Sequence, residues 1–196
     1  MQEMKDLQEK LDLSEAKNRL NNWVAISVAI IAVFMAITKV KDDNIVQAML
    51  QAKSDAVDTW NEYQAKKIKN HIAELGLNQV RALQVLAQGK GSAELSSQQK
   101  QYHDTIVRYQ TDEDALSKKA KGFEKQYDDL NFRDDQFDLS DATLSISLAM
   151  LAITALTGKR KLLALGLLFA GFGILMGLAG LMGLSLHPTA LVKLLS

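Results

Sequence analysis

The sequence predicts an all-α membrane protein with three transmembrane helices and a long extramembrane antiparallel helical hairpin, a coiled-coil stalk. Three observations predict this fold class. The apolar residues are gathered in three uncharged blocks, the chain of 196 residues contains one proline, and the region between the first two blocks has helical periodicity. A bilayer core about 30 Å thick requires about 20 apolar residues in a helix. Three such blocks in so short a chain are not expected of a soluble protein.

The first two elements are an amphipathic N-terminal helix at 1–22 and a transmembrane helix at 20–38. The N-terminal helix carries apolar residues on one face, namely Met4, Leu7 and Leu11. No charge lies between Arg19 and Lys39, so this segment can cross a bilayer. A cleaved signal peptide begins with a short basic region, whereas the residues before this block are slightly acidic. The block is therefore interpreted as an anchor.

Residues 39–141 are expected to form the extramembrane hairpin, with a turn near 88–99, where glycine and serine are frequent. On the first arm the apolar positions are Ile45, Met49, Ala52, Ala56, Trp60 and Tyr63, followed after a phase shift by Ile68, Ile72, Leu75, Ala82 and Leu86. On the second arm they are Tyr102, Ile106, Tyr109, Leu116, Ala120, Phe123, Tyr127 and Leu130. The second series has the spacing of a coiled-coil seam.

Two further transmembrane helices are predicted at 142–158 and 162–186, followed by a short tail at 187–196. In the third span, small residues recur on one helix face: Gly166, Ala170, Gly173, Gly177 and Gly180. Small residues allow helix backbones to approach closely in lipid. This face is therefore predicted to pack helices, either within one chain or between the subunits of an oligomer.

Charge asymmetry predicts the topology of the spans. The turn between the second and third spans is wholly basic, with Lys159, Arg160 and Lys161, and the segment from Asp128 to Asp141 is rich in aspartate. Short basic loops remain in the cytoplasm. We therefore expect a cytoplasmic N-terminus and an external, periplasmic location for residues 39–141.

The residues that carry chemistry are few. The chain has 23 basic and 23 acidic residues and no cysteine, which argues against a nucleic-acid partner and excludes thiolate sites. His71, His103 and His187 do not have metal-ligand spacing. The predicted spans contain no Asp, Glu, Lys or Arg, which argues against an ion-coupled transporter. No enzymatic activity, cofactor or metal is therefore predicted.

Two clusters outside the spans have more than one interpretation. The aspartates from Asp128 to Asp141 either gather cations or form an acidic flank that caps the next helix. The segment from Trp60 to Lys69 is either a recognition face for a partner protein or an aromatic layer of the stalk core with a solvated lysine edge. Its candidate residues are Trp60, Tyr63, Gln64, Lys66, Lys67 and Lys69.

The order of elements resembles a bacterial family of small membrane proteins, catalogued as domain of unknown function number forty-three thirty-seven. The resemblance covers about residues 20–186. Its specific part is the segment with Trp60, Tyr63, Gln64, Ala65, Lys66, Ile68 and Lys69. It implies a bacterial membrane protein with a coiled stalk, and it implies no activity. Together with the predicted spans, we expect a multi-pass protein of the bacterial inner (plasma) membrane.

The sequence thus predicts a non-enzymatic structural or interaction protein that contacts membrane lipid and self-associates through its spans and its coiled-coil stalk as a homo-oligomer. One alternative is an accessory subunit that docks on a larger membrane protein complex. Another is a passive homo-oligomeric channel, which serine and threonine side chains in the spans could line.

Overall fold

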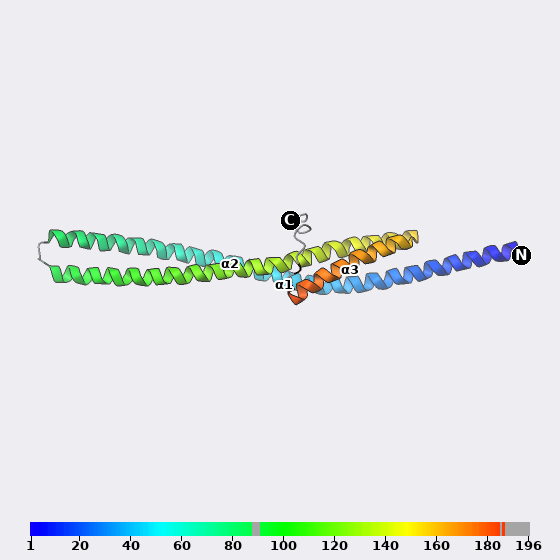
Figure 1. The fold of residues 1–196 in the computed structure, drawn as a ribbon, viewed down its shortest axis with the longest axis horizontal. Coiled ribbons are helices and arrows are strands. Elements are labelled where there is room, and N and C mark those ends of the chain that lie inside the picture. Colours follow the sequence, from blue (N-terminus) through cyan, green and yellow to red (C-terminus); the bar gives the residue numbers. More distant parts are fainter. Residues whose placement is uncertain (88–90, 185, 187–196) are drawn as a thin grey trace. The chain divides into compact units, whose positions relative to one another are not determined.

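The computed structural model describes residues 1–87, 91–184 and 186. These residues form three α-helices and no strands (Figure 1). The all-α fold class is therefore confirmed. Each helix contains a segment long and apolar enough to cross a membrane, which is compatible with a membrane location.

Helix α1 spans Gln2–Leu86 without interruption. The predicted N-terminal helix, the first predicted span and the first arm of the predicted hairpin are therefore parts of one helix. The sequence explains this continuity, because the first glycine of the chain is Gly76 and its one proline lies in the C-terminal tail. No residue before Gly76 is a strong helix breaker.

Helix α2 spans Ser92–Thr157 and helix α3 spans Arg160–Met182. Gly91 and Gly158, which precede and follow α2, have positive φ values of 72° and 68°, a conformation that glycine adopts without steric cost. The predicted turn near 88–99 is shorter than expected, because the chain is already helical at Ser92. Residues 88–90 lie outside the described residues.

Helix α3 ends earlier than the predicted limit at residue 186. Its C-cap is Gly183, which has a left-handed conformation with φ 66°. The N–H of Leu184 donates to the carbonyl of Ala179 at 2.9 Å, a bond that satisfies one of the free carbonyls at the helix end. The predicted tail at 187–196 lies outside the described residues.

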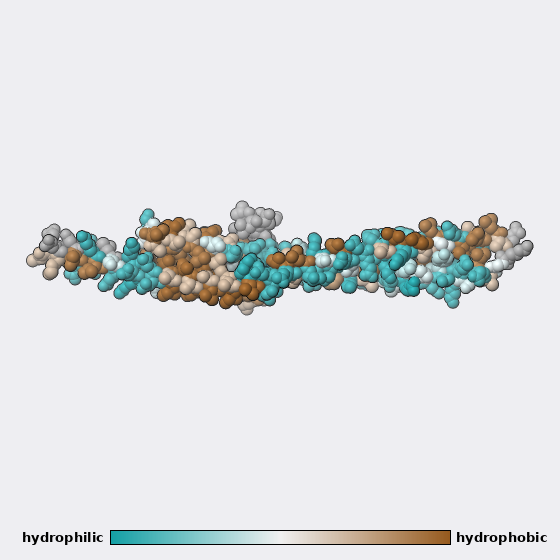
Figure 2. Space-filling model, turned by 180° about the vertical axis from the view of Figure 1, so that it is seen from behind, coloured by the Kyte–Doolittle hydropathy of each residue, from teal (hydrophilic) through white to brown (hydrophobic). Residues whose placement is uncertain are grey.

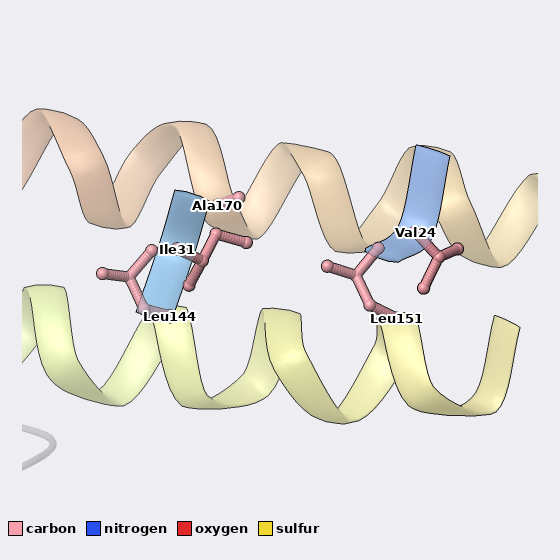
Figure 3. Packing of buried hydrophobic residues seen from close by; sticks show 5 residues of the cluster. All are labelled: Val24, Ile31, Leu144, Leu151 and Ala170. Atoms are coloured by element: carbon pink, nitrogen blue, oxygen red, sulfur yellow. The ribbon is translucent and has the colours of Figure 1, made fainter. Parts of the chain in front are cut away.

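The chain divides into two compact units, Met1–Gln47 with Leu130–Ser196, and Ala48–Asp129. In the first unit all three helices contribute to one apolar core (Figure 3). The buried residues of this core are Val24 and Ile31 of α1, Leu144 and Leu151 of α2, and Ala170 of α3. Its outer surface is also largely hydrophobic (Figure 2), as expected of candidate membrane spans.

In the second unit, α1 and α2 lie side by side and antiparallel (Figure 1). Three hydrogen bonds between side chains mark the pairing, at increasing distance from the connection: Gln84 to Ser96 at 3.2 Å, Lys66 to Asp112 at 2.7 Å, and Trp60 to Glu124 at 2.8 Å. Every residue of the predicted seam from Tyr102 to Leu130 is buried or half-buried. That part of the sequence pattern therefore gives the inner face of α2 correctly.

The phase shift predicted for the first arm is wrong. Ala73, Leu77 and Val80 are buried and continue the inner face of α1 without a shift. The residues assigned to the shifted face are exposed instead, namely Ile68, Ile72, Leu75, Ala82 and Leu86. The prediction followed the larger apolar residues. Small residues such as Ala73 are the ones that fit between closely packed helices.

Candidate functional site

An exposed, uncharged series of residues runs along α1 in the second unit. Its members recur at spacings of three or four residues, which places them on one face of the helix. We call this set the α1 outer series: Leu50, Ser54, Val57, Asn61, Gln64, Ile68, Ile72, Leu75, Gln79, Ala82 and Leu86. All are exposed. The larger apolar members are well exposed, with Ile68 at 60%, Ile72 at 62% and Leu75 at 63%.

The α1 outer series lies opposite the packed face of the helix. At 100° per residue, Ile68 and Leu77 point in opposite directions, and Leu77 is buried against Ile106 of α2. Helix α1 is therefore apolar on two opposite faces, of which α2 covers only one. On the space-filling surface, hydrophobic patches alternate with hydrophilic ones along this helix pair (Figure 2).

The segment from Trp60 to Lys69 is divided between the two faces. The half-buried Trp60 donates its ring N–H to Glu124 of α2 and lies edge-on to Tyr63, with ring centroids 5.3 Å apart. Lys66 forms an ion pair with Asp112 at 2.7 Å. Gln64, Lys67 and Lys69 are exposed, and the Lys67 ammonium lies 5.9 Å from the Tyr63 ring centroid.

The glycine face of α3 is occupied within the chain. A Cβ atom at Gly173 would lie 2.7 Å from Leu144, one at Gly177 would lie 2.7 Å from the Phe34 ring, and one at Gly180 would lie 2.9 Å from Phe137. Gly166 and Ala170 are buried in the same contact. The backbone also takes part, because Ser147 donates to the carbonyl of Gly166 at 2.7 Å.

The C-terminal end of α3 is held by two side chains of α2. Arg133 donates to the carbonyl of Gly180 from Nε at 3.2 Å and from Nη2 at 2.9 Å. Gln136 donates to the carbonyl of Leu184 at 2.7 Å. Carbonyls of the last helical turn lack partners within the helix, and Arg133 supplies donors to that of Gly180.

A carboxylate cluster that sequence reasoning missed lies between α1 and α2 of the first unit. Asp42 is buried, with 7% of its side chain exposed, and its Oδ2 accepts from Lys39 at 2.9 Å. The carboxyl group of Asp134 on α2 lies within hydrogen-bonding reach of Asp42, and Asp138 lies close enough to repel both. The sequence suggested only the α2 aspartates, because Asp42 is far from them in the chain.

The environment of this cluster changes its acidity. Burial, the hydrogen bond to Asp42 and the charge of Asp138 raise the pKa of Asp134 to about 7. Partial burial and the charges of Asp42 and Asp135 raise the pKa of Asp138, against the opposing effect of Lys39. A carboxyl group with such a pKa can carry a proton at neutral pH.

The remaining predicted residues, in the basic turn and among the histidines, do not form a common site. Lys159, Arg160 and Lys161 are exposed at the connection between α2 and α3. His71 lies 3.1 Å from Glu74, and His187 is outside the described residues. Among the described residues, no group of three or more histidine or acidic side chains could hold a metal ion.

These features define a class of protein: an all-α chain whose three long helices could each cross a membrane and pack together at a glycine face, and whose second unit is an antiparallel helix pair. The chain belongs to the family described as "Domain of unknown function (DUF4337)", whose model matches residues 20–183. The family resemblance of the sequence is therefore confirmed. Neither curated proteins nor solved structures gave a match.

Proposed function

We propose that this protein is a non-enzymatic, membrane-anchored interaction protein of the bacterial inner membrane that self-associates through the α1 outer series. One observation carries the proposal: the series is exposed along its whole length and contains no charged residue. A helix face that remains in water normally carries charged and polar residues. An uninterrupted uncharged face with Leu, Ile and Val at three- and four-residue spacing is typical of a face that meets another helix.

A second copy of the chain is the occupant that suits this face best. Two copies inserted in one membrane with the same topology present the series in parallel, and a two-fold axis then places each residue beside its own counterpart. Asn61 would meet Asn61 between the layers of Val57 and Gln64. A polar asparagine in such a seam fixes the register and favours a defined number of helices.

The glycine face of α3 is a weaker candidate for association. Phe34, Leu144 and Phe137 of the same chain already occupy the space that a neighbouring subunit would need. We therefore assign self-association to the helix pair. The spans then anchor the protein, with the N-terminus in the cytoplasm and the helix pair outside.

The absence of native cysteine allows a direct test by cross-linking. Asn61→Cys should form a disulfide-linked dimer in native membranes under mild oxidation, because the proposed axis places the two thiols together. Glu62→Cys is the matched control. This neighbouring position is also exposed but lies about 100° away around the helix, so it should remain monomeric. Equal cross-linking of both variants would contradict the proposal.

A second variant tests the energetics of the same face. Ile68→Glu combined with Ile72→Glu should dissociate the oligomer in mild detergent, because paired carboxylates would face each other in an apolar seam. Val107→Glu changes an exposed valine of α2 (49% exposed) and should leave the native mass unchanged. Cross-linking of Asn61→Cys only to a different protein would instead support the accessory-subunit alternative.

A further inference from the structure

The side chain of Asp42 has an unusual environment for a carboxylate. It is 7% exposed, and Lys39 satisfies only one of its two oxygens. The other oxygen, Oδ1, is buried and has no N–H or hydroxyl donor within reach. Burying a carboxylate oxygen without a donor is costly. Asp42 therefore requires a further group on this side.

On the opposite helix the carboxyl group of Asp134 lies within hydrogen-bonding reach of Asp42. Ionised carboxylates only accept hydrogen bonds, so a bond between the two requires that one of them is protonated. We propose that Asp42 and Asp134 form a proton-binding site in which one proton bridges the two carboxyl groups and joins α1 to α2.

The charges around the pair favour a proton. On α1 the facing groups are Lys39 and Asp43, and Lys39 is shared between Asp42 at 2.9 Å and Asp43 at 3.5 Å. On α2 they are Asp135, Asp138 and Asp141. The guanidinium of Arg133 is engaged with the carbonyl of Gly180. Helix α3 carries charges only at its first residues, Arg160 and Lys161. Carboxylates thus outnumber cations at this site.

The acidity of Asp134 agrees with this arrangement. Its pKa is raised to about 7, first by burial and then by the bond to Asp42. A pKa above the unfolded value means that the native state binds more protons between about pH 4 and pH 7. The stability of the native state must therefore fall as pH rises through this range, and change little above it.

Thermal unfolding of the full-length protein in detergent, followed by its helical circular dichroism, tests the proposal. The Tm of the native protein should decrease by several degrees between pH 5 and pH 8. Asp134→Asn should remove most of this decrease, because its amide donates to Asp42 at every pH; the raised pKa of Asp138 accounts for the remainder. Its Tm should exceed that of the native protein at pH 8. Asp43→Asn, the exposed neighbour of Asp42, should retain the decrease.

An infrared measurement keeps the proposal testable if Asp134→Asn does not fold. At pH 6 the native protein should show the carbonyl band of a protonated carboxylic acid, and this band should disappear as pH rises through 7. A Tm that is independent of pH in the native protein, or a missing acid band, would overturn the proposal. A third result would also overturn it. If added sodium or calcium chloride raised the Tm of the native protein at pH 8 but did not raise that of Asp134→Asn, the ligand of this site would be a metal ion.

Discussion

The glycines of α3 occupy two kinds of environment. Gly173 and Gly177 face side chains of α1 and α2 so closely that a Cβ atom at either position would approach within 2.7 Å of a neighbour. Gly171 has no atom within 4 Å of the position that its Cβ would take. The same substitution should therefore have opposite effects at these positions on one helix.

Gly177→Ala should lower the thermal stability of the protein, because the new methyl group meets the rigid ring of Phe34 and the hydroxyl oxygen of Ser140. We expect a loss of about 1–3 kcal/mol, the usual cost of overpacking. Gly171→Ala should be neutral or stabilising by up to about 1 kcal/mol, since alanine favours helix. Thermal unfolding in detergent measures both, and equal effects would show that this face is not packed as described.

Residue-level prediction from the sequence succeeded where spacing along one helix was sufficient. The spacing of Gly166 to Gly180 identified a packing face, but it could not identify the partner, because small residues promote close approach to any helix. Asp42 was missed for a related reason. Its neighbour Asp134 is on another helix, and only the packing of α1 against α2 brings the two carboxyl groups together.

At the scale of elements, α1 of the second unit has two apolar faces and only one partner. Both sets of apolar residues are visible in the sequence. The prediction treated them as one continuous face, which required a phase shift in the apolar spacing, and the helix has no such shift. The buried face is built largely from small or medium residues, such as Ala52, Ala56 and Ala73. Most of the large aliphatic residues, such as Ile68, Ile72 and Leu75, are on the outer face. Hydrophobicity alone could not rank the two faces, because burial also depends on the volume available between the helices.

Adjacent residues of α2 test which face stabilises the helix pair. Ile106 is 9% exposed and packs against Ala73 and Leu77, whereas Val107 is 49% exposed. Ile106→Ala should reduce the free energy of unfolding by about 2–3 kcal/mol through lost burial and the remaining cavity. Val107→Ala should change it by less than about 1 kcal/mol. Chemical denaturation of both variants measures the difference, and comparable losses would contradict the assigned inner face.

At the scale of the whole molecule, the fold class and the order of elements followed from the sequence, because uncharged blocks, helical periodicity and the scarcity of helix breakers all agree. The exact ends of the helices did not follow. Gly183 ends α3 through a left-handed backbone conformation, and a glycine in this apolar sequence gives no signal that distinguishes it from the packed glycines before it.

The orientation in a membrane remains a prediction from the basic residues Lys159 to Lys161, and labelling can test it. Ser92→Cys should react with a membrane-impermeant thiol reagent in cells with a permeabilised outer membrane, whereas Thr157→Cys should not. Both positions are exposed and helical. Substitution at Gly91 or Gly158 would instead strain a backbone with positive φ. The opposite labelling pattern would invert the proposed topology.

The antiparallel pairing of α1 and α2 also implies an order of folding. Gln84 and Ser96 are separated by only 12 residues along the chain, Lys66 and Asp112 by 46, and Trp60 and Glu124 by 64. The entropy lost on closing a loop grows with its length, and local contacts form fastest. Contacts next to Gly91 should therefore form first and shorten the loop that each later pair must close, so that the layer around Trp60 is among the last to form.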